Sequence, residues 1–336
     1  MKLKLFLSAV IASAAFAACS SGGEDEPETT TPTNPADRKI IIKVGENPFL
    51  DENGSARETR GAIITTQSLQ DFKMHWNKDA DVYSDYNVRR GTDDKWIPTP
   101  TNTDATIGTN TWPASVGNDE KISFYAHTNT TGLQGNAVYN FNNGEPYVSF
   151  NDEEASADQN DLLLSKMVNV SYNNTNGEKG VIWFTFDHAC AAVDFNIQIT
   201  NKLYTTTLQN TNLTVNSVKL MNVAKTGDCY YSSGSGNHIG EWKNVGNHWG
   251  DETSGYTNYT LTKSEAITVS TTPTALPCNS MFIIPQTLGE DAKLEIKYTL
   301  SGTEKTCYIL MSGTTWAAGY RYTINIALGT TLIQDP

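Results

Sequence analysis

The residue with the clearest chemistry in this chain is Cys19, a thiol that directly follows a short apolar run near the start of the sequence. A charged start with two lysines, an apolar run over residues 5–16 and two alanines before the cysteine follow the pattern of a secretory signal. The apolar run is too short to stay in a bilayer as a spanning helix. We therefore expect residues 1–18 to be a lipoprotein signal peptide and Cys19 to carry the lipid, as palmitate or a related acyl chain.

Residues 19–39 are polar, acidic and rich in proline and threonine. Such a stretch cannot bury enough apolar surface to fold, so it is predicted to be a disordered tether between the lipid and the folded body. The junction at Cys19 resembles a bacterial lipobox, and the acidic residues after it are similar to the surface-export signal of Bacteroidetes lipoproteins. Both predict a lipoprotein of the cell outer membrane with its body outside the cell. The alternative is an ordinary secretory signal with a coincidental cysteine.

The charge balance bears on the partners of the chain. It has 24 basic and 37 acidic residues and a formal net charge of -13. Nucleic acids and anionic membrane surfaces are bound by basic patches, so this balance predicts no nucleic-acid partner. It favours solubility outside a cell.

The remaining cysteines are an even set in an exported chain, which allows disulfides in three connectivities. They are Cys190, Cys229, Cys278 and Cys307. No two of them form a Cys-x-x-Cys pair, which argues against zinc. Cys190 stands in an apolar run and is expected to be a buried free thiol.

The sequence contains no motif for catalysis or cofactor binding: no nucleophile elbow, no His-Glu-x-x-His pair, no P-loop and no dinucleotide fingerprint. His238, Glu241 and His248 match no zinc spacing, so no metal site is predicted. We therefore expect that the chain is not an enzyme and has no cofactor.

Short runs rich in Val, Ile, Phe, Tyr and Thr, bounded by Asn, Gly, Asp and Pro, fill nearly the whole body. This pattern predicts an all-β fold of antiparallel β-sandwiches. The best helix candidate is residues 68–76, where Leu69, Phe72 and Trp76 fall on one helical face.

A polar stretch rich in asparagine and threonine, residues 196–212, suggests a division of the body. We predict two β-sandwich domains in tandem, an N-terminal one over residues 40–195 and a C-terminal one over residues 196–336. No repeat of fixed period is present, which argues against a solenoid or a propeller.

Several local patterns predict structural roles. His188 lies between two β runs and is expected to be a hydrogen-bonded core or corner residue. Trp112 is expected to pack against the sheet that begins at Lys121. Pro285 ends a strand and frees carbonyl groups that Gln286 can bond. Near the C-terminus, period two places four side chains on one face of a strand: Tyr320, Tyr322, Ile324 and Ile326.

The segment with the most mechanistic interest is the first β run, residues 40–50. A polar loop with glycine follows it and carries Arg57 and Arg60. Proteases cut such loops because the backbone can enter an active site without unfolding a core. A cut after either arginine would separate the first strand, the tether and the lipid from the rest of the body. The alternative is that both arginines belong only to a solvated loop.

The order of several segments over residues 57–328 resembles the fimbrillin family of Bacteroidales. These segments are ETRGAIITT, SLQDFKMHW, TWP with ISFYAHT, DLLLSK, FTFDHACAAVDFNI, SVKL, MFIIPQTL and WAAGYRYTINIAL. The resemblance implies surface lipoproteins of type V pili with two transthyretin-like, Greek-key sandwiches. It also implies that a trypsin-like protease removes the first strand, with Arg60 the better cleavage position and Arg57 the second. A strand from another fimbrial subunit then fills the vacated groove by donor-strand exchange.

The resemblance leads to a functional expectation: a pilus subunit or a fimbrial accessory lipoprotein that contributes to cell-surface adhesion. Only eight residues, 329–336, follow the last family-like strand. This length leaves open whether the chain donates a strand, and whether it is a stalk, an anchor, a tip or an unpolymerised surface lipoprotein.

A second expectation comes from residues 229–259, which concentrate aromatic side chains with glycine and asparagine. Aromatic faces beside amide and hydroxyl groups pack against sugar rings. Trp242, Trp249 and Tyr256 are therefore candidate binding residues for a glycan or protein on a host or bacterial surface. In this alternative the chain is a surface lipoprotein that binds glycan without polymerising. The structural reading of the same region is a self-packed loop or hairpin.

Overall fold

The computed structural model describes residues 38–51, 68–78, 81–100, 111–113, 115–128, 136–142, 144–152, 161–173, 175, 177–200, 213–233, 239–246, 255–276 and 280–328. The helices and strands assigned within these residues are all strands, which confirms the all-β class. In the same residues, no helix has the length and hydropathy needed to cross a membrane.

Taken in sequence order, and not by sheet, the described strands fall into three groups. The first group is β1 (Ile41–Glu46), β2 (Asp71–Lys78), β3 (Asp81–Arg90), β4 (Trp96–Pro100), β5 (Ile122–Thr128), β6 (Asn136–Asn142), β7 (Glu145–Asn151), β8 (Leu163–Val170) and β9 (Val181–His188). The second is β10 (Ala191–Ile199), β11 (Leu213–Ala224), β12 (Thr226–Ser233), β13 (Ile239–Lys243) and β14 (Tyr256–Val269). The third is β15 (Thr274–Ala275), β16 (Met281–Ile283), β17 (Lys293–Leu300), β18 (Thr303–Leu310) and β19 (Arg321–Leu328).

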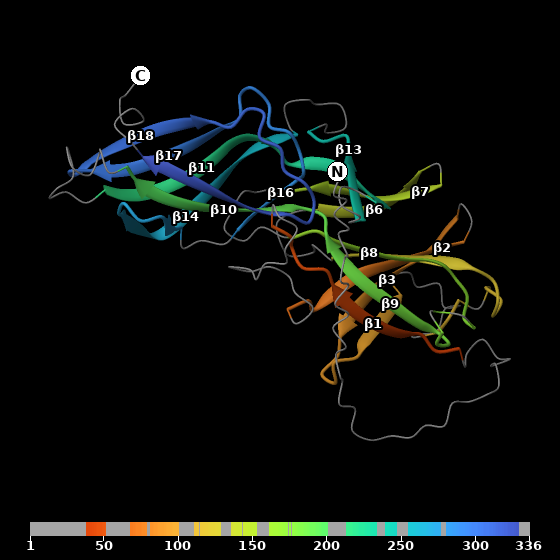
Figure 1. Cartoon of the computed structure of the whole chain (residues 1–336). Coiled ribbons are helices and arrows are strands. Elements are labelled where there is room, and N and C mark those ends of the chain that lie inside the picture. The colour runs from red at the N-terminus through yellow and green to blue at the C-terminus, as the bar shows by residue number, and fades with distance from the viewer. Residues whose placement is uncertain are drawn as a thin grey trace, which may run out of the picture.

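Seven strands of the first half close into a barrel in the order β1-β4-β3-β2-β5-β8-β9. The ladder closes because β1 pairs with β4 on one side and runs parallel to β9 on the other. In Figure 1 this barrel is the lower body, where the red-brown β1 lies beside the green β9. Its interior is filled by aromatic rings, among them Phe72, Phe184 and Phe186, in edge-to-face contacts. The N-terminal sandwich that the sequence predicts is therefore a closed sheet.

The helix predicted over residues 68–76 is wrong, because β2 occupies most of this segment. Phe72, Met74 and Trp76 are all buried in the barrel core. Burial at every second position is the period of a strand. Phe72 and Trp76 satisfy both a helical and a strand pattern, so the short segment was ambiguous. Pairing with β3 and β5 on its two sides decides for the strand.

The second half forms a sandwich of two sheets, and Figure 1 shows it as the upper body. One sheet has the order β14-β11-β17-β18, and in the other β10 is paired with β15, β16 and β19. Alternate apolar residues from both sheets share one core, as in the buried positions Val215, Ile296 and Ile326. This sandwich is of the kind predicted from the sequence.

A third sheet, β13-β12-β7-β6, combines strands from both halves of the chain. β7 pairs with β12 from Thr226 opposite Asn151 to Tyr230 opposite Tyr147. The boundary predicted between residues 195 and 196 falls within β10, whose partners are strands of the second half. The division of the chain at that position stays a prediction.

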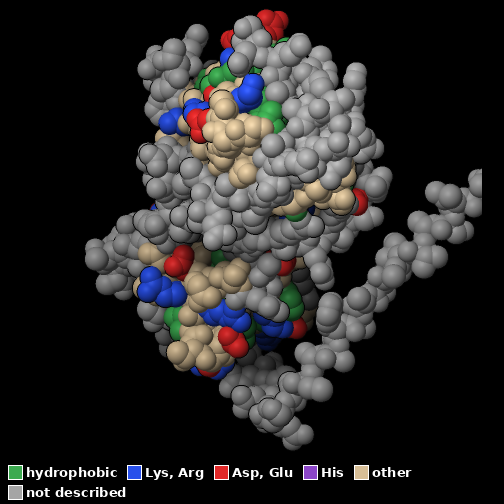
Figure 2. Space-filling view, turned by 90° about the vertical axis from the view of Figure 1, so that its left-hand side faces the viewer, with side chains coloured by type: hydrophobic (Ala, Val, Ile, Leu, Met, Phe, Trp, Pro, Cys, Tyr) green, Lys and Arg blue, Asp and Glu red, His purple; other side chains and the backbone are tan. Residues whose placement is uncertain are grey.

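The face drawn in Figure 2 shows how charge is distributed on the described part of the surface. Basic and acidic side chains are interspersed there, and the hydrophobic side chains form small separate areas.

Most of the local patterns have the structural roles predicted for them. Trp112 is buried, and its ring meets Phe124 edge-on at a centroid distance of 5.4 Å. Gln286 follows the end of β16 and donates from Nε2 to the carbonyl of Ile284 at 2.9 Å. The same side chain accepts the amide of Ala224 at 3.0 Å. Cys190 is a buried free thiol, as expected, and so are Cys229 and Cys307.

Candidate functional site: the first strand and its groove

Several residues that the sequence singles out lie outside the described residues. They are Cys19, Arg57, Arg60, His238, His248, Trp249 and Cys278. What the structure does describe is the segment just before the two arginines, residues 38–51, which is called the N-terminal segment below. Its contacts show how firmly the first strand is held and by what.

The start of the N-terminal segment is fixed by a buried arginine. Arg38 Nη1 donates to the carbonyl of Val116 at 2.5 Å and to Asn118 Oδ1 at 3.1 Å, while Nη2 donates to the carbonyl of Pro113 at 3.1 Å. The carbonyl of Arg38 accepts the amide of Trp112 at 2.6 Å. Burial lowers the pKa of the Arg38 guanidinium. The chain thus enters β1 from a defined position at the loop around residues 111–118.

β1 itself is a regular strand with one buried face. Ile40 and Ile42 are each 6% exposed and belong to the barrel core, whereas Ile41 between them is 54% exposed. The strand runs parallel to β9, from Ile41 opposite Val181 to Glu46 opposite Phe186. With β4 it shares only the register position of Ile42 and Trp96. Main-chain pairing to β9 and two isoleucine side chains therefore hold most of β1.

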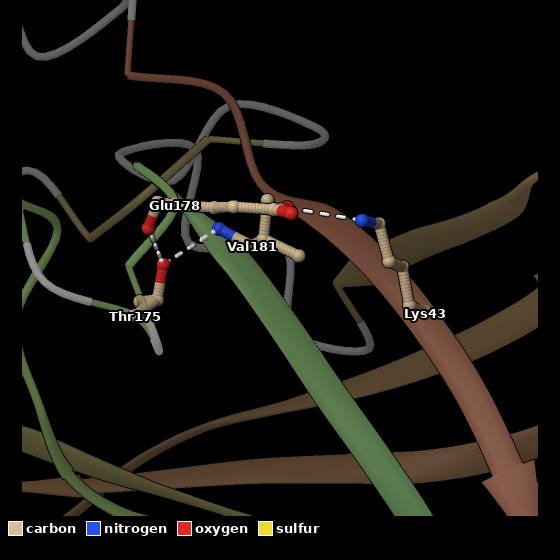
Figure 3. Close-up of polar contacts among 4 residues, drawn as sticks. All are labelled: Lys43, Thr175, Glu178 and Val181. Atoms are coloured by element: carbon tan, nitrogen blue, oxygen red, sulfur yellow. Dashed lines mark hydrogen bonds and ion pairs between the residues drawn. The ribbon is translucent and has the colours of Figure 1, made fainter. Parts of the chain in front are cut away.

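A polar tie of β1, the ion pair of Lys43 and Glu178, is drawn in Figure 3. Lys43 Nζ is 2.9 Å from Glu178 Oε2, and the two side chains are 37% and 52% exposed. The turn that carries Glu178 is fixed by Thr175, whose hydroxyl donates to the Glu178 carbonyl and accepts the amide of Val181 at 3.0 Å. Lys43 Nζ also lies 4.7 Å from the centre of the Trp183 ring. An exposed ion pair of this kind contributes about 0 to 1 kcal/mol.

After β1 the N-terminal segment reaches a second buried position at Phe49. This side chain is 0% exposed, and its ring stacks on His188 at a centroid distance of 3.8 Å and an interplanar angle of 20°. Phe282 of β16 lies 6.3 Å away on a similar plane. The imidazole is held by Asp161, whose Oδ2 is 2.5 Å from His188 Nδ1. Burial raises the pKa of the Asp161 carboxyl, against the opposing effect of His188.

The hydrogen-bonded role predicted for His188 is thereby confirmed, but its contact with Phe49 could not be read from the sequence. The segment then ends on the sandwich. The amide of Leu50 donates to the carbonyl of Gly319 at 2.9 Å, and its carbonyl accepts the amide of Arg321 at 2.7 Å. The N-terminal segment therefore fills a continuous path from the barrel core to the first residues of β19.

The aromatic region of the second half forms a hairpin where it is described. Trp242 on β13 is partly buried, donates from Nε1 to the carbonyl of Ala189 at 2.7 Å, and meets Phe150 edge-on. Tyr256 at the start of β14 is 45% exposed. Trp242 therefore lies in the packed hairpin of β12 and β13, and Tyr256 is exposed on β14, which pairs with β11. Glycan binding by Trp242, Trp249 and Tyr256 stays a prediction.

The protein is all-β and has two main β bodies. One is the barrel that β1 closes, the other is the sandwich, and the N-terminal segment contacts both. A family model described as fimbrillin-like matches residues 65–335, and the chain belongs to this family. A comparison with curated proteins finds no match.

Among solved structures, the chain is similar to a fimbrial protein from Bacteroides vulgatus ATCC 8482, with 16% sequence identity and a TM-score of 0.50. The match covers 89% of this chain and 97% of that one. A protein with a suggested role in cell adhesion, from Bacteroides ovatus ATCC 8483, is 13% identical with a TM-score of 0.47, covering 88% and 94% of the two chains. At such identities the likeness to the first structure shows the fold alone.

Proposed function

We propose that this chain is a pilus subunit or a fimbrial accessory lipoprotein that assembles by protease-triggered donor-strand exchange. In this role it contributes to adhesion at the cell surface. The observation that carries the proposal is the position of β1: it is the strand that closes the barrel, and it precedes the loop with Arg57 and Arg60. Membership in the fimbrillin-like family supports the same role and makes other fimbrial subunits the expected partners.

The contacts of the N-terminal segment are suited to release and replacement. After a cut at Arg60 or Arg57, only non-covalent contacts would hold residues 38–51 in the fold. Ile40, Ile42 and Phe49 are the buried apolar side chains of the segment. Burial of each contributes about 1.5 to 3 kcal/mol to the free energy of unfolding. The folded chain with an empty groove would therefore be less stable than the chain with a filled groove, by roughly 5 to 9 kcal/mol from these three side chains alone.

An empty groove also exposes main-chain groups. Loss of β1 would leave β9 without its parallel partner and would open the barrel between β9 and β4. An extended segment of another chain can satisfy both needs, with main-chain hydrogen bonds along β9 and alternate apolar side chains in the core. The same physical contacts that hold β1 would then join two subunits.

The anchor and the protease complete the proposal. Lipidation at Cys19 would hold the newly exported chain at the cell outer membrane, exposed on the surface. Cleavage at Arg60 or Arg57 by a trypsin-like maturation protease would separate the body from the lipid and free it for the fimbrium. The support for this part is the sequence pattern around Cys19 and the two arginines.

Limited trypsin treatment of the lipid-free mature chain tests the proposal. We expect a first cut at Arg60, a lesser one at Arg57, and then a ladder of assembled species on a native gel. The double variant Arg57→Gln with Arg60→Gln should stay whole and monomeric under the same treatment. A clean cut in this loop that yields only stable monomers would contradict assembly and favour the glycan-binding alternative.

A further inference from the structure

We propose that the pocket of Phe49 is a specificity subsite of the groove, and that it selects an incoming strand from another subunit by an aromatic ring at one fixed position. This inference rests on the proposed function, because it assumes that β1 is replaced. It goes further by stating which feature of the replacing strand sets its register.

The contacts of β1 alone leave the register open. Ile40, Ile42 and Val44 point toward the barrel core at every second position. Because the side-chain period of a strand is two, a shift by two residues keeps apolar side chains on the inner face. A replacing strand with several alternating β-branched residues could therefore bind in more than one register if β1 were its only guide.

Phe49 removes this ambiguity, since its pocket lies beyond the regular ladder. The last main-chain bond to β9 is from the amide of Asn47 to the carbonyl of Phe186, at 2.8 Å. Pro48 has no amide hydrogen and ends the pairing there. Phe49 then enters a separate core between the barrel and the sandwich, together with Phe282 and residues of the third sheet. A strand shifted by two residues would miss this pocket.

The shape of the pocket favours a flat ring. The imidazole of His188 stacks nearly parallel to Phe49, and Asp161 fixes its orientation through the 2.5 Å contact at Nδ1. Both polar side chains are buried, at 2% and 1% exposed. An aliphatic side chain would fill part of the space but lose the stacking, and a charged one would be buried without a partner. The expected occupant is Phe, with other aromatic residues next.

Peptide exchange on the trypsin-cut full mature chain tests the inference. The probe is a fluorescein-labelled peptide of residues 38–51, whose binding is followed by fluorescence anisotropy. Phe49→Ala in the peptide should weaken binding about 100-fold, at the lower end of what loss of a buried Phe costs, and Phe49→Leu about 10-fold. Ile41→Ala is the matched control, because this side chain points to solvent, and it should change binding less than about 3-fold.

A peptide in which Phe49 and Asp51 are exchanged tests register at constant composition. Its ring comes two residues late, so it should bind as weakly as the Phe49→Ala peptide. Equal binding of the unchanged, Phe49→Ala and exchanged peptides would overturn the subsite and leave strand exchange intact. If even the unchanged peptide fails to enter the cut protein, strand exchange itself is wrong, and the subsite with it.

Discussion

β1 and β19 are both parallel partners in sheets whose other pairings are antiparallel, but the two strands are held in different ways. β1 pairs with β9, and β19 pairs with β10, the strand that directly follows β9 in the chain. One polar tie of β1 is the exposed pair of Lys43 and Glu178. The polar tie of β19 is Arg321, which is buried and lies with Nε 2.6 Å from Asp194 Oδ2.

This difference bears on the strand exchange proposed above. The ladder of β1 to β9 and the buried side chains of Ile40 and Ile42 are contacts that any extended segment with a suitable pattern can supply. Side-chain hydrogen bonds of Arg38 before the strand and of Asn47 after it add to these contacts. Strand β19 depends in addition on one buried guanidinium opposite one carboxylate, with Ser280 bonded to the same carboxyl group. A strand without an arginine at that position would leave Asp194 without its cationic partner, with Ser280 as its remaining hydrogen-bond donor. For the proposed strand exchange, the comparison means that replacement of β19 would break the buried ion pair of Arg321, whereas the ion pair of β1 is exposed.

The largest effect is expected from breaking the buried tie of β19. Arg321→Ala should lower the free energy of unfolding by about 3 to 5 kcal/mol, because it removes a buried guanidinium and leaves the part-buried Asp194 without its cationic partner. Urea unfolding followed by tryptophan fluorescence measures this. The matched variant Lys43→Ala removes the exposed tie of β1 and should cost less than about 1 kcal/mol. Equal losses in the two variants would remove the distinction between the strands.

The next effect concerns the two faces of β1. Ile42→Ala should lower the free energy of unfolding by about 2 to 4 kcal/mol, since the side chain is buried in the barrel core. Ile41→Ala is the same chemical change one residue away on the exposed face, and it should cost less than about 0.5 kcal/mol. The same urea titration compares them. A small effect of Ile42→Ala would show that β1 contributes little to the barrel.

The smallest effect is a loss of stability at low pH that is expected for the barrel and not for the sandwich. Burial, with the neighbouring His75, lowers the pKa of His127 to about 3. The unfolded chain takes up a proton near pH 6.5 and the folded barrel does not, so stability is lost as the pH falls below about 6.5. Between pH 7.5 and pH 5 this one group should cost the barrel about 2 kcal/mol.

Hydrogen exchange at the two pH values checks this prediction. All histidines among the described residues are on barrel strands: His75, His127 and His188. Amides of β2 and β5 should therefore lose protection at pH 5 before those of β11 and β17. His127→Gln, which does not titrate, should reduce the pH dependence. Uniform loss across both bodies would speak against a barrel-specific effect.

The sequence by itself determined the all-β class and several local structures. Alternation of apolar and polar residues sets one face of each strand, and this is a local property. The roles of Trp112 and Gln286 could be predicted because each contacts a strand near it in the sequence. Trp112 packs on Phe124 of β5, and Gln286 donates to the carbonyl of Ile284, just after β16. The helix predicted over residues 68–76 failed because a run of nine residues fits both periods, and only the pairing of β2 with two other strands resolves it.

Tertiary structure alone decided how distant segments meet. Closure of the barrel depends on β1 lying opposite β9, about 140 residues later in the chain. The stacking of Phe49 on His188 and the pair of Arg321 with Asp194 also join positions more than a hundred residues apart. No local propensity records such pairings, since they follow from strand order and from which buried groups find a partner when the sheets close.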